Sequence, residues 1–276
     1  MIRSLLRLPL CSAVAASALV GYLVAGGDCS LRAAWLGLGV LLAATGATIL
    51  NQWQERYSDA LMKRTRCRPL ASGQLRPAAG LGLGLGLAAT GTLLLAGVNW
   101  RSGVLTLSIF LLYHFLYTPM KRRTMLALLP GALCGALPPT IGWLAAGGRL
   151  QDPRLVTLTA LLLLWQIPHS WQILLRRRHD LCRAGLFPEL HRLPPARLQK
   201  LIFVWILALS TATLLIPTLI IPGSSMIRWL SLGLAAAPLV ALFYPHANND
   251  SAPVAGWQRT TGVFFLGTVM GLLLFY

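Results

Sequence analysis

The fold is decided by one polar stretch, Asn51-Gln52-Trp53-Gln54-Glu55-Arg56-Tyr57-Ser58-Asp59-Ala60-Leu61-Met62-Lys63, and by the apolar run in front of it. Asn51, Glu55, Asp59 and Lys63 are spaced four apart, and four helical residues turn the chain by only about 40° beyond a full circle. In a helix these four side chains therefore lie on one side. Charges close to a bilayer are costly and are usually functional or interfacial. The spacing predicts a row of metal and phosphate ligands where a membrane span ends.

The composition of the chain is that of an integral membrane protein. Of its 276 residues, 56% are hydrophobic and 11% are charged, and the mean hydropathy is +0.66. Soluble domains are about a quarter charged. The formal net charge of +17 could indicate a nucleic-acid-binding protein, but that reading needs a basic face on a soluble fold. We therefore expect no nucleic-acid partner. The five scattered cysteines contain no C-x-x-C pair and predict neither a disulfide framework nor a zinc site.

Nine apolar stretches are long enough for spanning helices, which need about 20 mostly apolar residues. They cover roughly residues 6–25, 33–52, 79–98, 102–118, 125–147, 154–175, 199–221, 227–244 and 258–275. No long insertion interrupts them. The sequence predicts an all-α, polytopic membrane helix bundle that forms a single domain over residues 1–276, with polar loops at about 51–78 and 176–198.

Lys and Arg are distributed unevenly over the two sides of this predicted bundle. The N-terminus and the loops after the second, fourth, sixth and eighth helices share one side, which collects all but five of the 24 Lys and Arg residues. The five on the other side are Arg32, Arg101, Arg149, Arg154 and Arg228. Positive residues collect in cytoplasmic loops. We expect the N-terminus and both polar loops to be cytoplasmic.

A glycine-rich run, Gly80-Leu81-Gly82-Leu83-Gly84-Leu85-Gly86, contains the pattern G-x-G but follows no strand. Nucleotide-binding loops need that strand. The pairs 80 with 84 and 82 with 86 instead predict a surface for close helix packing.

The polar loops contain the residue types that bind a diphosphate. Magnesium takes oxygen ligands, commonly one or two carboxylates together with waters and phosphates. Glu55, Asp59 and Asp180 are the candidate metal ligands, and Lys63, Arg64, Lys121 and Arg122 are candidates for neutralising diphosphate oxygens. The alternative is a solvated loop that only sets the orientation of the protein, since charge runs at the ends of spans are common.

Histidines lie in three different settings. Trp165-Gln166-Ile167-Pro168-His169 forms a proline-broken polar segment near the end of the sixth predicted helix. Backbone groups freed by a proline must be satisfied inside protein, so Gln166 and His169 are expected to face the bundle interior; a helix-end histidine bonded to a neighbouring backbone group is the alternative. His114 is interpreted as a packed core residue and His179 as a solvated one.

These motifs together resemble the UbiA-type membrane prenyltransferases. Asn51-x-x-x-Glu55-x-x-x-Asp59 is similar to their N-x-x-x-D-x-x-x-D signature, and the tail Met62-Lys63-Arg64-Thr65-Arg66-x-Arg68-Pro69 resembles the protoheme IX farnesyltransferase branch. Later segments resemble that branch in the same order: Tyr117-Thr118-x-x-Lys121-Arg122, Gly135-Ala136-Leu137-Pro138-Pro139, Trp165-Gln166-x-Pro168-His169 and Asp180.

The resemblance implies a nine-helix bundle with cytoplasmic loops that cap the active site. It implies that Mg2+ helps farnesyl diphosphate to ionise, that a vinyl group of heme B attacks the resulting cation, and that water completes heme O. It assigns catalysis to Asn51, Glu55, Asp59 and Asp180, and the heme side to His169 and Tyr117. Heme-oxidase assembly proteins are candidate partners.

Two residues depart from the family pattern: Glu55 stands where Asp is usual, and Tyr57 stands where this branch commonly has another Asp. Other readings therefore stay open: a prenyltransferase of the same family with another aromatic or chlorin acceptor, and a non-catalytic paralogue. A transporter would need polar residues across the midplane, whereas here they cluster at one face.

Overall fold

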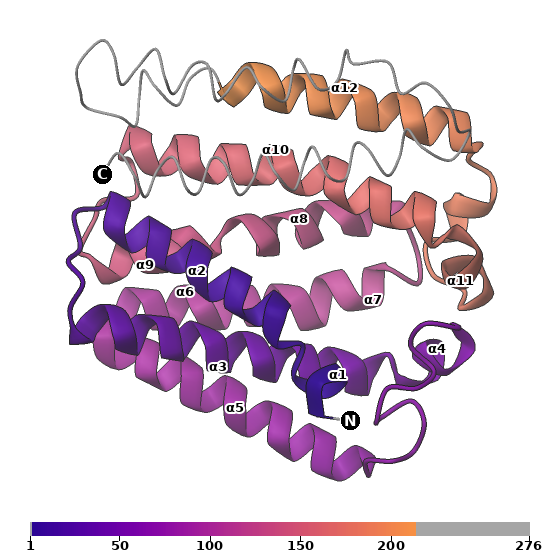
Figure 1. The fold of residues 1–276 in the computed structure, drawn as a ribbon, viewed down its shortest axis with the longest axis horizontal. Helices are drawn as coiled ribbons and strands as arrows, with labels where there is room; N and C mark the ends of the chain where they lie inside the picture. Colours follow the sequence, from indigo (N-terminus) through magenta and orange to yellow (C-terminus); the bar gives the residue numbers. More distant parts are fainter. Residues whose placement is uncertain (1, 214–276) are drawn as a thin grey trace. The chain divides into compact units, whose positions relative to one another are not determined.

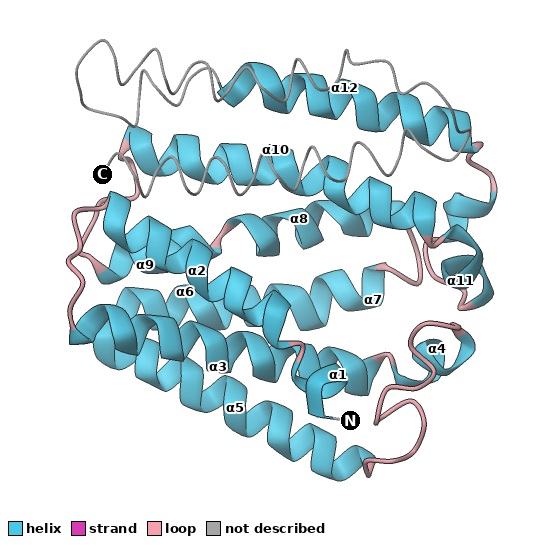
Figure 2. Ribbon diagram, viewed as in Figure 1, coloured by secondary structure: helices cyan, strands magenta, loops and turns pink. Residues whose placement is uncertain are grey.

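The computed structural model describes residues 2–213, and every regular element in this part of the chain is a helix (Figures 1 and 2). Five segments are long and apolar enough to cross a membrane: Leu31–Gln54, Pro77–Val98, Trp100–Met120, Met125–Ala145 and Pro153–Arg176. A shorter apolar helix, α2 (Leu8–Val24), precedes them. The predicted all-α, polytopic architecture is confirmed.

The first six predicted spans coincide with helical segments. The second, third and sixth are single helices, α3 (Leu31–Gln54), α5 (Pro77–Val98) and α10 (Pro153–Arg176). The fourth consists of α6 (Trp100–Leu111), the π-helix η1 (Leu112–Tyr117) and α7 (Thr118–Met120), and the fifth of η2 (Met125–Ala127), α8 (Leu128–Ala136) and α9 (Pro138–Ala145). The seventh begins as α12 (Pro195–Thr213). The predicted spans 227–244 and 258–275 lie outside the described residues, so the count of nine stays a prediction.

The chain divides into two compact units. The first combines Met1–Arg149 with Arg177–Arg192 and therefore contains α1 (Ile2–Leu6) to α9, together with α11 (Arg178–Arg183) and η3 (Pro188–His191). The second combines Leu150–Arg176 with the described residues from Leu193 onwards, and in it α10 packs against α12. The single domain predicted for residues 1–276 stays a prediction.

The core of the first unit lies where α2, α3, α5 and α9 meet. Its buried side chains come from all four helices: Ala15, Ala18, Tyr22, Leu36, Val40, Leu95, Ile141 and Ala145. Large apolar side chains are also exposed on α2, α3 and α5, such as Leu10, Trp35 and Leu93, as expected for helices that contact lipid. Burial in this core fixes the direction of α3, whose carboxyl end supports the polar residues discussed below.

Helices α3 and α5 approach closely because glycines face each other across their contact, and Figure 1 shows the two side by side. A Cβ atom at Gly46 would overlap the backbone of Gly84 and Ala88, and one at Gly91 would overlap the backbone of Ala43. Glycine is therefore required here by space. The predicted packing surface is only half right, because Gly82 and Gly86 face open space while Gly80 and Gly84 meet side chains of Leu70 and Leu50.

The N-terminal helix α1 lies against the last turns of α3. The side-chain amide of Gln52, which is fully buried, donates a hydrogen bond to the carbonyl of Leu5 at 2.8 Å. Leu5 itself packs with Ile49 and Leu70 in a small buried cluster. This contact covers the face of α3 next to the polar residues at its end.

Candidate active site

The candidate site lies at the carboxyl end of α3, where the chain passes into the short helix α4 (Arg56–Leu61). Glu55 joins the two helices: its N–H donates to the carbonyl of Asn51 at 2.9 Å, and the N–H of Asp59 donates to the carbonyl of Glu55 at 2.7 Å. The four-residue hydrogen-bonding pattern thus continues across the junction. Asn51, Glu55 and Asp59 lie on successive turns as predicted, and all three are buried.

Lys63 departs from this row, contrary to the sequence prediction. Helix α4 ends at Leu61, and the extended backbone of Met62 turns the chain away before Lys63 is reached. Lys63 and Arg64 are therefore exposed in the turn that follows α4. The prediction was wrong because nothing in the four-residue spacing shows where the helix stops.

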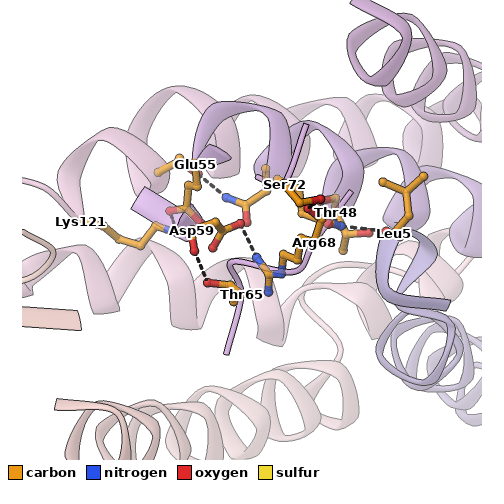
Figure 3. Close-up of polar contacts among 11 residues, drawn as sticks. Leu5, Thr48, Glu55, Asp59, Thr65, Arg68, Ser72 and Lys121 are labelled. Carbon is orange, nitrogen blue, oxygen red and sulfur yellow. Dashed lines mark hydrogen bonds and ion pairs between the residues drawn. The ribbon is translucent and has the colours of Figure 1, made fainter. Parts of the chain in front are cut away.

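Each buried carboxylate of the row is paired with one cation of the same chain (Figure 3). Glu55 forms an ion pair with Lys121, and Asp59 Oδ2 accepts a hydrogen bond from Arg68 Nη1 at 2.6 Å. All four side chains have little exposed surface. Ions removed from water need partners of opposite charge, because the lost hydration is worth several kcal/mol per ion, on the order of what a good pair returns.

One oxygen of this arrangement is left over. Asp59 is only 1% exposed, and yet its Oδ1 has no hydrogen-bond partner among the described residues. Burial raises the pKa of the Asp59 carboxyl, and the neighbouring Arg68 opposes this shift. An orphan carboxylate oxygen beside a second carboxylate on the adjacent turn is the donor chemistry that Mg2+ takes, so the residues present fit this ion.

The two polar loops and the short loop after α7, which contains Lys121, are joined by hydrogen bonds within the first unit. The N–H of Lys63 donates to Asp180 Oδ1 at 3.3 Å, and the N–H of Phe187 donates to the carbonyl of Lys121 at 2.7 Å. Glu189 Oε2 accepts a hydrogen bond from the N–H of Met125 at 2.9 Å. The loop that contains Lys121 is thereby fastened to the loop that contains Asp180.

Asp180 lies in α11 and contacts the first loop through the backbone of Lys63. Within the described part of the chain, no three Asp, Glu, His or Cys side chains gather as a metal site. Glu55 and Asp59 lie on adjacent turns, and Asp180 stays a predicted third ligand. Two carboxylates are sufficient for magnesium when phosphate oxygens complete its shell.

Positive charge is concentrated beside the carboxylates. Partial desolvation, together with repulsion by Arg177, Arg68 and Arg7, lowers the pKa of Arg64 to about 10, so its guanidinium remains charged at neutral pH. Attraction by Glu55 raises the pKa of Lys121 in spite of the opposing effect of burial. Arg122 Nη2 donates to the carbonyl of Gln54 at 3.4 Å, and the Lys121 ammonium lies 4.6 Å from the centre of the Tyr117 ring. The cations predicted to bind a diphosphate therefore lie around one region.

The two departures from the family pattern differ in their surroundings. Glu55 is buried and paired, whereas Tyr57 is 70% exposed, and the guanidinium of Arg56 lies over its ring at 4.3 Å. The replacement of Asp by Tyr57 thus changes only the exposed surface of the loop. The replacement of Asp by Glu55 changes a side chain of the buried ion pair with Lys121.

Three polar residues of this region, Arg68, Gln54 and His114, were given no functional role from the sequence, and His114 was interpreted as a packed core residue. Arg68 belongs to the recognised motif tail, nine residues after Asp59, and that position was the available signal for its pairing with Asp59. Gln54 and His114 are joined across α3 and η1 by two hydrogen bonds. No sequence pattern indicates the contact between Gln54 and His114, because these residues are 60 positions apart.

His169 belongs to the second unit. It is half-buried in α10, and its ring stacks on that of Trp165 with centroids 4.7 Å apart. The predicted helix break at Pro168 was wrong, because α10 continues from Pro153 to Arg176 with Pro168 inside it. Long membrane helices tolerate such a proline where neighbouring groups satisfy the freed carbonyl.

Comparison with known families decides the assignment of the chain. The model of the UbiA prenyltransferase family matches residues 14–272. The chain belongs to this family. The assignment of Asn51, Glu55 and Asp59 to the first motif of this family, and of Asp180 to its second polar loop, stays a prediction from the resemblance.

Similar curated proteins have one name in common. The chain is 41% identical over 221 residues to a protoheme IX farnesyltransferase of Geobacter sulfurreducens, and the match covers 78% of each chain. It is 36% identical over 250 residues to the protein of that name from Anaeromyxobacter sp., covering 89% of this chain and 80% of the relative.

Solved structures of the family have the same fold. A UbiA homolog from Aeropyrum pernix K1 in its apo form matches with a TM-score of 0.73 at 16% identity, covering 95% of this chain and 98% of that chain. A UbiA homolog from Archaeoglobus fulgidus bound to GPP and Mg2+ matches with a TM-score of 0.66 at 15% identity, covering 98% of this chain and 99% of that chain.

Proposed function

We propose that this UbiA-family protein transfers the farnesyl group of farnesyl diphosphate to a vinyl group of heme B and so forms heme O. The observation that carries the proposal is the buried pair Glu55 and Asp59, each held against a cation, in a chain 36–41% identical to protoheme IX farnesyltransferases over most of its length. The identity supports the choice of substrates. The pair supports catalysis.

In this proposal the acidic residues of the site hold the metal ion and the basic residues bind the diphosphate. Asp59 Oδ1 and the carboxylate of Glu55 would hold Mg2+, which when bound neutralises diphosphate oxygens and stabilises the leaving group. Lys121, which is paired with Glu55, and Arg122, which donates to the Gln54 carbonyl, would bind phosphate oxygens, Lys as a point charge and Arg as a fork. Lys63 and Arg64, exposed on the turn after α4, would add positive charge beside the carboxylates. Asn51, which contacts Thr118 at 3.4 Å, fixes the end of α3 against the chain that leads to Lys121.

The acceptor side is assigned by resemblance. Tyr117 lies under the Lys121 ammonium, and His169 matches a histidine of the heme-using branch. We place the protein in a bacterial inner membrane with its N-terminus and the loops 51–78 and 176–198 in the cytoplasm, where farnesyl diphosphate is available. Heme-oxidase assembly proteins are proposed as partners that receive the product.

Product analysis by mass tests the proposal. Membranes containing the protein, supplied with farnesyl diphosphate, heme B and Mg2+, should form heme O. We expect Asp59→Ala to abolish product, because the ion loses its orphan oxygen, and Glu55→Asp to keep or raise activity, because it restores the usual acid. Tyr57→Phe is the matched control on the exposed face and should leave the rate unchanged. A fully active Asp59→Ala protein would contradict the carboxylate mechanism.

The divergent first motif leaves a second candidate function, a prenyltransferase for another aromatic or chlorin acceptor. The observation behind it is Glu55, whose additional methylene changes the reach of the carboxylate. Diphosphate release without heme O, together with a prenylated product from another acceptor, would favour this function. Heme binding without any diphosphate release would instead indicate a non-catalytic paralogue.

A further inference from the structure

One buried histidine near the site has a ring nitrogen without a partner. His114 is 4% exposed, and its Nε2 has no hydrogen-bond partner among the described residues. A buried polar atom left unpaired costs about 1–3 kcal/mol, so most buried nitrogens are paired. The mechanism proposed above does not use His114 Nε2.

The other nitrogen of the ring is held by Gln54. The Gln54 amide donates from Nε2 to the backbone carbonyl of His114 at 3.3 Å, which turns its oxygen toward the ring, and Oε1 lies 2.8 Å from Nδ1. An amide oxygen can only accept, so Nδ1 must carry the proton of the neutral imidazole. Nε2 is therefore left with a free lone pair.

This is the state in which histidine binds metal ions. Metal-ligating histidines almost always donate their second N–H to a carboxylate, a carbonyl or water, which fixes the tautomer and the ring orientation. Here an amide oxygen provides that acceptor. The aromatic rings of Phe110 and Tyr113 lie 4.5 and 5.1 Å from the imidazole, and flat apolar rings are suitable neighbours for a porphyrin.

The backbone around His114 is also unusual. Residues Leu112–Tyr117 form a π-helix, which is rare and occurs often at functional sites. The same helix contains Tyr117, and Thr118 directly after it contacts Asn51. Gln54 lies next to Glu55, so the histidine is fastened to the turn of α3 that supports the carboxylate row.

We propose that His114 is an axial ligand of the acceptor: its Nε2 binds the iron of the porphyrin, and Gln54 orients the ring. This inference rests on the proposed function for the identity of the acceptor, an iron porphyrin. According to this proposal, η1 holds the acceptor beside the site where the diphosphate ionises. Gln54 is a positioning residue because it acts only through His114.

Heme titration of the purified full-length protein tests the inference without turnover. Ferric heme alone is added, and the absorption and electron paramagnetic resonance spectra report the iron ligand. The wild-type protein should give a histidine-ligated spectrum. His114→Gly should lose it, and added imidazole should restore it by entering the space of the missing ring. Gln54→Leu should keep the spectrum but weaken heme binding by about 10-fold, the usual effect of losing a partner of a ligand.

Two exposed histidines serve as controls. His179→Ala and His191→Ala remove exposed rings and should leave the spectrum unchanged. His169, placed on the heme side by resemblance, is the competing candidate ligand, and His169→Ala should keep the histidine-ligated spectrum even if it changes the affinity for heme. If His114→Gly retains the wild-type spectrum, or if only His169→Ala loses it, His114 is a packed core residue and the inference is wrong. Circular dichroism of each variant separates lost ligation from lost folding.

The outcome is distinct from that of the product assay. A protein that forms heme O while His114→Gly keeps its heme spectrum contradicts the ligand assignment alone. A protein that binds heme through His114 but forms no heme O contradicts the proposed reaction alone.

Discussion

Each of the two buried carboxylates of the site is paired with its own cation, and these pairs affect the protonation of the carboxylates. Asp59 is paired with Arg68, while its second oxygen has no partner, and burial raises its pKa. Glu55 and Lys121 form a separate pair. The ionised form of Asp59 is the form that can bind a cation. In the proposed mechanism the charge of Arg68 would therefore influence the pH at which Asp59 becomes protonated and activity falls.

Removing the charge of Arg68 should move the acidic limit of activity to higher pH. The pKa of Asp59 is already raised by burial, so activity falls on acidification at a higher pH than for an ordinary aspartate, as the carboxylate becomes protonated. Arg68 opposes this shift, and Arg68→Gln should raise the pKa further. The pH dependence of kcat/KM for both proteins measures the effect. An acidic limb that stays in place, or that moves to lower pH, would contradict the assigned role of Arg68.

The sequence was sufficient for part of the site. The spacing of Asn51, Glu55 and Asp59 predicted their common row because periodicity within one helix is a local property. The pairing of Arg68 with Asp59 and of Gln54 with His114 depends on how separate segments pack, which local spacing does not contain. Lys63 was misplaced for a related reason, since a helix end at Leu61 has no glycine or proline to mark it.

At the level of the elements, the closest contact is between α3 and α5. Gly46 lies against the backbone of Gly84 and Ala88, so a methyl group there must push the helices apart. Because α3 also supports the carboxylate row, separation of the two helices would displace Glu55 and Asp59. The stability and the activity of the protein are thus linked through this contact.

We expect Gly46→Ala to destabilise the protein by about 1–3 kcal/mol, the usual cost of overpacking, although alanine favours helix. Gly86→Ala is the matched control, because nothing lies within 4 Å of a Cβ atom at Gly86. It should be neutral or slightly stabilising. Thermal unfolding in detergent compares the two variants. Equal midpoints for both would show that the close approach of the helices does not limit stability.

Hydropathy predicted the elements well and their local irregularities poorly. The apolar runs of α3, α5 and α10 are long and uninterrupted, so their lengths alone identify them. The π-helical turn at Leu112–Tyr117 occupies six residues, too few for a change of period to be visible in the sequence. Likewise, Gly82 and Gly84 have the same neighbours in sequence, and only the rotation of α5 decides which of them faces α3.

For the whole molecule, the testable feature is its orientation in the membrane. Cys29 lies between α2 and α3, and Cys67 lies beyond α4, and both are exposed. The 24 residues of α3 separate these two positions along the chain, a length of about 36 Å, which exceeds the hydrocarbon core of a bilayer. The two thiols are therefore expected on opposite sides.

Single-cysteine variants should distinguish the two sides. With the other four cysteines replaced by serine, a membrane-impermeant maleimide added to intact spheroplasts should label the Cys29 variant but not the Cys67 variant. Labelling of the Cys67 variant should appear after the membrane is opened. The reversed pattern would place the polar loops outside the cell and contradict the orientation predicted from the distribution of Lys and Arg.

The pairing of Glu55 with Lys121 has a consequence for turnover. The ammonium that is suited to a phosphate oxygen is already bound to a carboxylate of its own chain, so an arriving anion must compete with Glu55 for it. The same competition operates in reverse after reaction, since Glu55 can reclaim the ammonium from pyrophosphate. In the proposed mechanism this ion pair would therefore lower the affinity of the Lys121 ammonium for the substrate diphosphate and speed the release of pyrophosphate.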